Sequence, residues 1–372
     1  MHITALRLAN FRNYDRLDFQ PAEGLNVIVG PNAQGKSALL ESIYLLATSK
    51  SHRTSRDSEM IRIGEQFARA CAEVNRSART DVTIEIVIQQ AEQKTIKINS
   101  VKHERVGDVV GQLNAVIFSG ADLDMVKGEP SRRRRFLNLE ISQVSPRYVY
   151  ALGRYKRVLD QRNNLLKNIK SGPASSSDLR IWDSQLAGYG AAVMARRIEF
   201  VKLVSAAASR IYGLLSGGSE ALEVTYKPSL DSGPDADEKL LAERFASALA
   251  ARVELDVARG TTGVGPHRDD LVFRVDNLPA REFASQGQQR TAAIALKLAE
   301  IELIEDYVGE PPVVLLDDVM GELDEIRRAQ VLEVTAGRCQ TLLTSTHLSD
   351  IGEHALGRAT VWDVRSGQVS LK

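Results

Sequence analysis

The alternation of apolar and polar residues changes its character along the chain. Apolar positions recur every second residue in segments 82–88 and 95–99, which predicts two strands joined by a hairpin loop at 89–94. From about residue 130 to 215 the apolar positions recur with helical spacing, broken by a Gly-, Pro- and Ser-rich stretch at 171–177. These patterns predict an antiparallel sheet followed by a helical hairpin that projects as an arm.

Continuous apolar runs predict strands of a second kind. Segments 25–29 and 311–316 are largely apolar, as is typical of parallel strands buried on both faces. We therefore predict an α/β fold, in which a mixed sheet and an antiparallel β subdomain form a head and the helical arm is an inserted domain. The expected division is a first lobe of the head at 1–125, the arm insert at 126–257 and the remainder of the head at 258–372.

A glycine-rich turn separates the first apolar run from a helical pattern, and it fits the spacing of a P-loop. Glycines allow several backbone N–H groups to face phosphate oxygens, and the positive end of the following helix adds to this attraction. We expect Lys36 to reach the β- and γ-phosphates of ATP, and the Ser37 hydroxyl to bind Mg²⁺. The predicted nucleotide-binding residues of this turn are Gly30, Pro31, Asn32, Ala33, Gln34, Gly35, Lys36 and Ser37.

Two carboxylates follow the second apolar run. Parallel strands present their carboxyl ends at the edge of the sheet where ligands bind, which places Asp317 and Asp318 beside the P-loop. This is the form of a Walker B motif, in which Asp317 holds Mg²⁺ and Asp318 orients or deprotonates the attacking water. The alternative is that the pair only caps a helix.

A histidine ends another predicted strand, at 341–347. Such a histidine is often structural, but its position after the Walker B segment suits a sensor of the γ-phosphate. We therefore place His347 with Lys36 and Asp318 among the predicted catalytic residues.

A capped helix start lies at 285–290. Ser285 and Gln288 have the Ser-x-x-Gln spacing of a capping box, and an amphipathic helix follows. Gly287 allows close approach to the exposed N–H groups, and the Ser285 hydroxyl adds a donor at the positive end of the helix. The pattern predicts an anion site, with Ser285, Gly287 and Gln288 as further nucleotide-binding residues.

Composition limits the classes of protein. The 372 residues carry no formal net charge, so binding to nucleic acid requires local basic clusters. The two cysteines form no CxxC pair, which suits a reducing cytosol. No signal-peptide pattern or membrane-length apolar run is present in the sequence. We expect a soluble cytoplasmic protein with no membrane partner.

Basic residues gather in two places that are candidates for contact with DNA phosphates. We name Lys50, Arg53 and Arg56 in the loop after the P-loop helix, and Arg132 and Arg133 at the start of the arm. The alternatives are a solvated loop in the first place, and a solvated helix start or ion pairs with neighbouring glutamates in the second.

The set formed by the P-loop, the capped helix at Ser285, the Walker B segment and Glu322–Asp324 resembles an ABC-type ATPase head, with SMC-like organisation. In that family the signature serine and glycine bind the γ-phosphate held by the P-loop of a second subunit, and Glu322–Asp324 resembles the D-loop at the same interface. More closely, the order of short motifs resembles the RecF family of bacterial recombination mediators. These motifs are Leu8–Tyr14, Lys50–Thr54, Val126–Gly128, Arg132–Leu137, Gly265–Asp270 and Ser285–Arg290.

The resemblance to the RecF family implies a function. It implies an ATP-dependent homodimer that clamps single- or double-stranded DNA at gaps and junctions, and that works with RecR and RecO to load RecA in DNA repair and replication-fork maintenance. It also implies a weak, DNA-stimulated ATPase whose slow hydrolysis resets the clamp. The sequence departs from the family pattern at two positions. The family usually has Pro-Glu after the serine of Phe118–Leu123, and many ABC heads have Glu where this chain has Asp318.

Two other functions share part of this pattern. The nucleotide-binding subunit of a transporter, or another SMC-like ATPase, has the same head motifs, but a transporter subunit has a smaller helical insert and a membrane partner. A metabolic P-loop kinase would transfer phosphate to a small molecule and would leave the capped Ser285 helix without a purpose.

Overall fold

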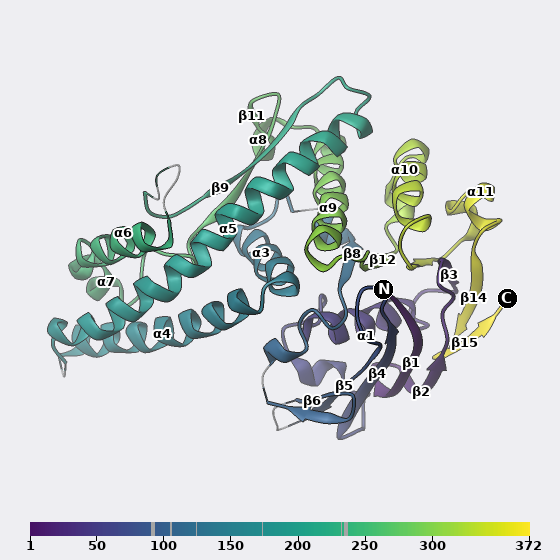
Figure 1. Ribbon diagram of the computed structural model, residues 1–372, viewed down its shortest axis with the longest axis horizontal. Helices are drawn as coiled ribbons and strands as arrows, with labels where there is room; N and C mark the ends of the chain where they lie inside the picture. The colour runs from purple at the N-terminus through teal and green to yellow at the C-terminus, as the bar shows by residue number, and fades with distance from the viewer. Residues whose placement is uncertain (91–93, 105, 124, 173, 232, 234–236) are drawn as a thin grey trace.

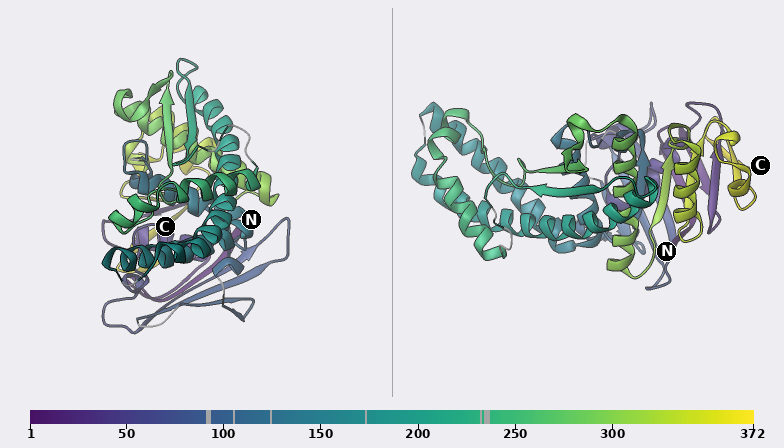
Figure 2. Two further views of the ribbon diagram at one scale, coloured as in Figure 1. Left: turned by 90° about the vertical axis from the view of Figure 1, so that its left-hand side faces the viewer. Right: turned by 90° about the horizontal axis from the view of Figure 1, so that it is seen from above.

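The computed structural model describes residues 1–372 except 91–93, 105, 124, 173, 232 and 234–236. Figure 1 shows an elongated molecule in which a helical arm extends from a head built around sheets. The C-terminus lies at the end of the head that is opposite the arm (Figure 2). The chain therefore builds part of the head, then the arm, and returns to complete the head.

The first sheet of the head has the P-loop strand near its centre. In spatial order its strands are β15 (Gln368–Leu371), β14 (Thr360–Arg365), β3 (Leu25–Val29), β13 (Thr341–Ser345), β12 (Val313–Asp317) and β8 (Ala115–Ser119). Neighbouring strands are parallel, except for the antiparallel edge pair of β14 and β15. The apolar runs at 25–29 and 311–316 are confirmed as the buried strands β3 and β12.

Side chains of this sheet alternate between two cores. Val27 and Val29 of β3 pack in a core shared with the arm helices, whereas Ile28 packs in a second core with α1 (Lys36–Thr48) and the antiparallel sheet. Both faces of β3 are therefore covered, which explains why its sequence is apolar without alternation.

The second sheet of the head is antiparallel throughout. In spatial order its strands are β2 (Tyr14–Phe19), β1 (His2–Phe11), β4 (Phe67–Asn75), β5 (Val82–Gln89), β6 (Thr95–Ile98) and β7 (Val101–His103). The strands predicted at 82–88 and 95–99 are confirmed, while the hairpin loop predicted at 89–94 lies partly outside the described residues. The N-terminal strands β1 and β2 belong to this sheet too.

The arm is helical, as its spacing predicts. Its helices are α3 (Pro130–Val144), α4 (Pro146–Ser171), α5 (Leu179–Leu215), α6 (Glu238–Ala250) and α7 (Val253–Arg259). Helices α4 and α5 pack against each other as the predicted hairpin, and α5 continues into contact with α9 (Gln286–Val308) of the head. This long shared helix ties the arm to the head (Figure 1).

A third, small sheet lies beside α5. Its strands are β9 (Leu222–Lys227), β10 (Asp270–Val275) and β11 (Leu278–Pro279), all antiparallel. Strands β9 and β10 lie on either side of the predicted boundary at 257–258, so the division into three parts stays a prediction. The remaining helices are α2 (Gly120–Leu123), α8 (Ala280–Phe283), α10 (Glu325–Ala336) and α11 (Glu353–Leu356), with 3-10 turns at Asp57–Met60, Val106–Asp108, Ser176–Asp178, Met320–Glu322 and Leu348–Asp350.

Candidate nucleotide-binding site

The glycine-rich turn joins the carboxyl end of β3 to the first turn of α1. A Cβ atom at Gly30 would lie 2.3 Å from the carbonyl oxygen of Val364 on β14. At Gly35 the φ angle is +119°, and a Cβ atom would lie 2.7 Å from the Asn13 amide nitrogen. Both positions therefore require glycine, and the turn leads into a helix start whose first N–H groups have no acceptor within the helix.

Lys36 is held inside this turn. Its Nζ donates hydrogen bonds to the carbonyl oxygens of Gly30, at 2.6 Å, and Pro31, at 2.9 Å. Burial lowers the pKa of the Lys36 ammonium, although the nearby Asp318 and Asp317 act in the opposite direction. The ammonium thus lies folded back on the loop, where it is available to exchange carbonyl oxygens for phosphate oxygens.

Ser37, in the first turn of α1, meets Asp317 and Thr344, which lie at the carboxyl ends of the neighbouring strands β12 and β13. The Ser37 hydroxyl donates to Asp317 Oδ1 at 2.7 Å, and the Thr344 hydroxyl lies 3.0 Å from the same oxygen. The parallel register pairs Asp317 with Thr344, which fixes this geometry. Burial would raise the pKa of Asp317, but the contacts with His52, Ser37 and Thr344 outweigh it and lower the pKa.

The Ser37 hydroxyl and the Asp317 carboxylate fit the hard oxygen ligands that Mg²⁺ prefers. In the described part of the chain, no group of three or more His, Cys, Asp and Glu side chains gathers to bind a metal ion. Mg²⁺ completes its coordination with water and substrate phosphates in such sites. A magnesium ion here would therefore be bound together with a nucleotide.

Asp318 lines a cavity of about 640 Å³ together with Lys36 and Ser37. Its φ angle is +55°, so the backbone at Asp318 is left-handed and no longer extended as in β12. Its backbone N–H donates to the Thr344 hydroxyl at 3.0 Å. Partial burial raises the pKa of Asp318, the Lys36 charge opposes this rise, and the Asp317 charge adds to it. A carboxylate with a raised pKa in such a cavity suits the role of positioning or deprotonating water.

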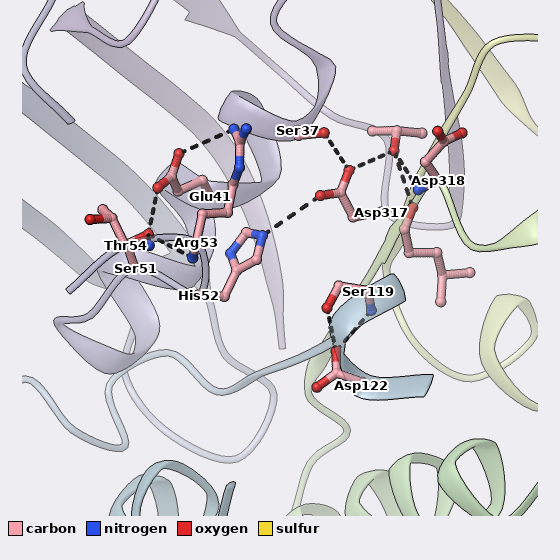
Figure 3. Close-up of polar contacts among 12 residues, drawn as sticks. Ser37, Glu41, Ser51, His52, Arg53, Thr54, Ser119, Asp122, Asp317 and Asp318 are labelled. Atoms are coloured by element: carbon pink, nitrogen blue, oxygen red, sulfur yellow. Dashed lines mark hydrogen bonds and ion pairs between the residues drawn. The ribbon is translucent and has the colours of Figure 1, made fainter. Parts of the chain in front are cut away.

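His52 is a residue of the site that the sequence analysis did not identify. Its Nε2 lies 3.6 Å from Asp317 Oδ2 (Figure 3). Its ring packs edge-on against Tyr44. The sequence showed only a polar basic loop here, because nothing in the spacing of that loop indicates which side chain turns inward. The Lys50–Thr54 motif was the available signal.

Arg53 faces the same cleft, and because its side chain is exposed its assignment to DNA stays a prediction. Its guanidinium lies 3.6 Å from buried Glu41, and the side chain lines the cavity with the P-loop (Figure 3). Glu41 also accepts hydrogen bonds from Arg12, at 2.7 and 2.8 Å, and from Ser51. Arg12 and Asn13 line this cavity as well, and the sequence analysis assigned neither to the site.

The capped helix start predicted at Ser285 is confirmed in its local geometry. Ser285 accepts from the Gln288 N–H at 3.2 Å, and the Gln288 side chain accepts from the Ser285 N–H at 2.8 Å. A Cβ at Gly287 would have only the Ser285 hydroxyl nearby, at 3.8 Å, and both residues are exposed. Figure 1 shows this end of α9 next to α8 and away from α1. The two halves of the predicted site are therefore far apart within one chain.

The segment expected to form a D-loop lies beside the signature helix. Arg290 of α9 contacts Glu322 at 3.4 Å, and Asp324 caps α10 by accepting from the Arg327 N–H at 2.9 Å. His347 follows β13 with an exposed side chain, and its backbone N–H donates to Ser345 at 3.2 Å. The sensor role of His347 stays a prediction.

The other candidates for contact with DNA divide into exposed and buried residues. Lys50, Arg56 and Arg132 are exposed, so their assignment stays a prediction. Arg133 is only 2% exposed, and its guanidinium binds both carboxylate oxygens of Asp270, at 2.7 and 2.9 Å. The prediction for Arg133 is wrong because its charge is used inside the protein, to tie α3 to β10.

Comparison with known proteins identifies the family. Residues 2–361 match the family model described as the RecF/RecN/SMC N terminal domain. The chain is 41% identical over its whole length to the DNA replication and repair protein RecF of Halalkalibacterium halodurans, and covers all of that protein. It is 40% identical over 99% of its length to RecF of Bacillus mycoides, covering 98% of that protein. The chain belongs to the RecF family.

Solved structures agree with this membership. A structure of the recombination mediator protein RecF-ATP in the RecFOR pathway matches with a TM-score of 0.92 and 34% identity, covering 100% of this chain and 97% of that one. The Smc head domain of Pyrococcus furiosus matches with a TM-score of 0.55 and 16% identity, covering 96% of that chain, which supports the fold alone. The predicted α/β fold, an ABC-type ATPase head with a helical arm, is therefore confirmed for this RecF-family chain.

Membership of the RecF family confirms the family resemblance seen in the sequence. Among the described residues, none of the helices has the length and apolar character needed to cross a lipid bilayer.

Proposed function

We propose that this chain is an ATP-switched DNA clamp of the RecF type, in which two copies enclose two ATP molecules. The observation that carries the proposal is the separation of the two halves of the site. Lys36, Ser37 and Asp317 come together in one cleft, whereas Ser285 lies exposed at a distant helix start. An exposed anion site without its own phosphate motif fits the γ-phosphate held by a second copy.

ATP then acts as a bridge between two chains. Its phosphates and Mg²⁺ are held by Lys36, Ser37 and Asp317, and Asp318 activates the attacking water. A ligand shifts an equilibrium only by its differential affinity for the two states, and here the dimer offers ATP the additional donors of Ser285. Hydrolysis removes the bridge, and a slow, weak ATPase thus resets the clamp.

The partners of the clamp follow from the family. Relatives are DNA replication and repair proteins, and one solved relative is described as a recombination mediator in the RecFOR pathway. We propose that the dimer binds DNA at gaps and junctions, and that it acts with RecR and RecO to promote loading of RecA. A cytoplasmic location fits these partners.

The proposal predicts that DNA affinity depends on ATP. We expect anisotropy titrations of a labelled duplex to show tighter binding with ATP and Mg²⁺ than with ADP, because only ATP assembles the dimer. Coupling free energies of this kind are about 1–3 kcal/mol, or roughly 5- to 150-fold in affinity. Asp318→Asn retains the predicted Mg²⁺ ligands and should hydrolyse ATP slowly, so ATP stays intact during a titration with this variant. Equal DNA affinity with ATP, with ADP and without nucleotide would contradict the proposed ATP switch.

A further inference from the structure

A second cavity, of about 380 Å³, lies where the head meets the arm. Its walls come from the loop after α1, from α3, α4 and α5, and from the Pro266–His267 turn. Five of its lining residues are cationic, and Asp and Glu are absent from the lining. These five, which we call the cationic pocket, are Lys50, Arg134, Arg135, Lys156 and Arg197.

The charge of the cationic pocket is poorly compensated. Within the described part of the chain, Asp269, at 3.7 Å from Arg197, is the one carboxylate within 4.0 Å of any of the five. Arg134 and Arg135 instead donate to backbone carbonyl oxygens, those of Asp269 and Ser51. Partial desolvation, with Lys50 and Arg197 close by, lowers the pKa of the Lys156 ammonium. These cations therefore repel one another, and a bound anion would relieve that repulsion.

Part of the pocket is rigid and part is adaptable. Arg197 is 1% exposed and is fixed by hydrogen bonds to Tyr148, Pro266 and Asn138 at 2.7 to 3.0 Å. Lys50 and Lys156 are exposed at its mouth. A fixed guanidinium group at the base and exposed ammonium groups at the rim suit a phosphate group that stays attached to a larger molecule outside.

We infer that the cationic pocket binds a phosphate group, and that the phosphate is supplied by the backbone of a nucleic acid lying along the junction of head and arm. The choice of a nucleic acid as the source of the phosphate rests on the proposed function. The inference assigns the contact with the backbone phosphate to Arg134, Arg135 and Lys156, in addition to Lys50. A free phosphorylated molecule would offer the same chemistry and is distinguished by experiment below.

One short segment, Lys50–Ser55, forms a wall of both cavities. Lys50, Thr54 and Ser55 line the cationic pocket, whereas Arg53 lines the nucleotide cleft. Between them, His52 lies 3.6 Å from the predicted magnesium ligand Asp317 (Figure 3). A phosphate held at one side of this segment and a nucleotide held at the other are thus linked by six residues, which gives a physical route by which each affects the affinity for the other.

The test compares two neighbouring cations of α4. Lys156→Ala removes a lining charge, and Arg157→Ala removes an exposed charge from the next position, which lies outside the pocket lining. With a labelled duplex in ATP and Mg²⁺, we expect Lys156→Ala to bind more weakly and to lower the slope of log K against log salt by about 0.9, the value for one lost phosphate contact. Lys50→Ala should act in the same way, and Arg157→Ala should match the unaltered protein.

A second experiment uses inorganic phosphate as the probe. It measures the midpoint temperature of thermal unfolding at saturating ATP and Mg²⁺. If Lys156→Ala loses a phosphate-induced rise that Arg157→Ala keeps, while duplex binding is the same in both, the source is free phosphate and the nucleic acid is overturned. If the two variants match each other in both experiments, the phosphate site is overturned. If the unaltered protein binds no duplex with ATP, the proposed function fails, and the phosphate experiment still tests whether the cationic pocket binds phosphate.

Discussion

Asp317 and Asp318 are neighbours in sequence, yet their carboxyl groups have opposite pKa shifts. Asp317 is surrounded by Ser37, Thr344 and His52, whose contacts lower its pKa, whereas Asp318 turns into the cleft, where partial burial raises its pKa. The left-handed backbone at Asp318 produces this divergence, because it sends the second side chain away from the metal position. The Asp317 carboxylate is thus suited to binding a cation, and the Asp318 carboxylate is suited to accepting a proton.

Asp318→Asn should separate binding from chemistry. We expect ATP hydrolysis to fall by roughly 10²- to 10⁴-fold, the usual contribution of a positioned acid or base. Affinity for ATP and Mg²⁺ should be retained, because Ser37 and Asp317 are unchanged. Steady-state hydrolysis and equilibrium ATP binding provide the measurements, with Asp317→Asn as the variant that loses Mg²⁺-dependent affinity. Hydrolysis by Asp318→Asn at the unaltered rate would contradict the assignment.

His267 predicts a dependence of stability on pH. Its Nδ1 accepts from the Tyr155 hydroxyl at 2.6 Å and its Nε2 donates to the Thr262 carbonyl at 2.9 Å, and burial lowers its pKa to about 4. Between pH 6.5 and 4 the unfolded chain binds a proton here and the folded chain does not, so stability falls as the pH falls. At 1.36 kcal/mol per pKa unit, the loss is at most about 3 kcal/mol.

Denaturant unfolding at pH 7 and pH 5 measures this effect. His267→Gln keeps one acceptor and one donor but does not titrate, so we expect its stability to fall less between the two values than that of the unaltered protein. An identical loss in both proteins would show that His267 does not cause it.

At the scale of elements, the sequence predicted what local patterns determine. The buried strands around the P-loop, the alternating strands β5 and β6, and the helical hairpin of the arm were all predicted, because each is specified by periodicity within one segment. The addition of β1 and β2 to the antiparallel sheet was not, since pairing over a long sequence separation leaves no local pattern.

The candidate site shows the same division. The P-loop and the capping box at Ser285 have motifs with fixed spacing, and the structure gives both the expected local geometry. His52, Arg12 and Asn13 have no such spacing and were missed. Arg133 was assigned to DNA because a run of four arginines suggests a surface, although Asp270, distant in sequence, pairs with it inside.

The arm contains a buried charge that should govern its stability. Arg162 is fully buried and donates to Asp183 at 2.6 Å and to Asp256 at 2.9 Å. Arg162→Ala would leave the buried Asp256 with only the Gly263 N–H, at 3.1 Å, and the more distant Arg252, at 4.0 Å, and we expect a loss of about 3–5 kcal/mol. Arg157→Ala, an exposed change on the same helix, should stay within about 0.5 kcal/mol.

Urea unfolding followed by far-UV circular dichroism compares the two arginine variants. Because the arm helices pack in one core with strands of the head sheet, we expect the loss in Arg162→Ala to appear as a lower urea midpoint of the shared transition. Superimposable curves for the two variants would show that the ion-pair network does not stabilise the arm.

For the whole molecule, the central claim is that one chain holds half of each ATP site. The start of α1, which follows the P-loop, and the start of α9 lie apart within the chain (Figure 1). Under the proposed function, a complete site therefore needs Lys36 of one copy and Ser285 of another. In a dimer of one variant, both ATP sites are defective. Lys36→Ala alters the P-loop half of each site, and Ser285→Arg alters the half that comes from the start of α9. A mixed dimer has one site with both defects and one with none.

Trans-complementation of these two variants is the most direct test. We predict that each variant alone has almost no ATPase activity, and that an equimolar mixture recovers up to about one quarter of the unaltered rate, since half of the dimers are mixed and each has one of two sites intact. Ser247→Arg, an exposed change on α6, is the control for adding an arginine and should keep full activity. A mixture whose rate equals the mean of the two separate variants would contradict a site shared between chains.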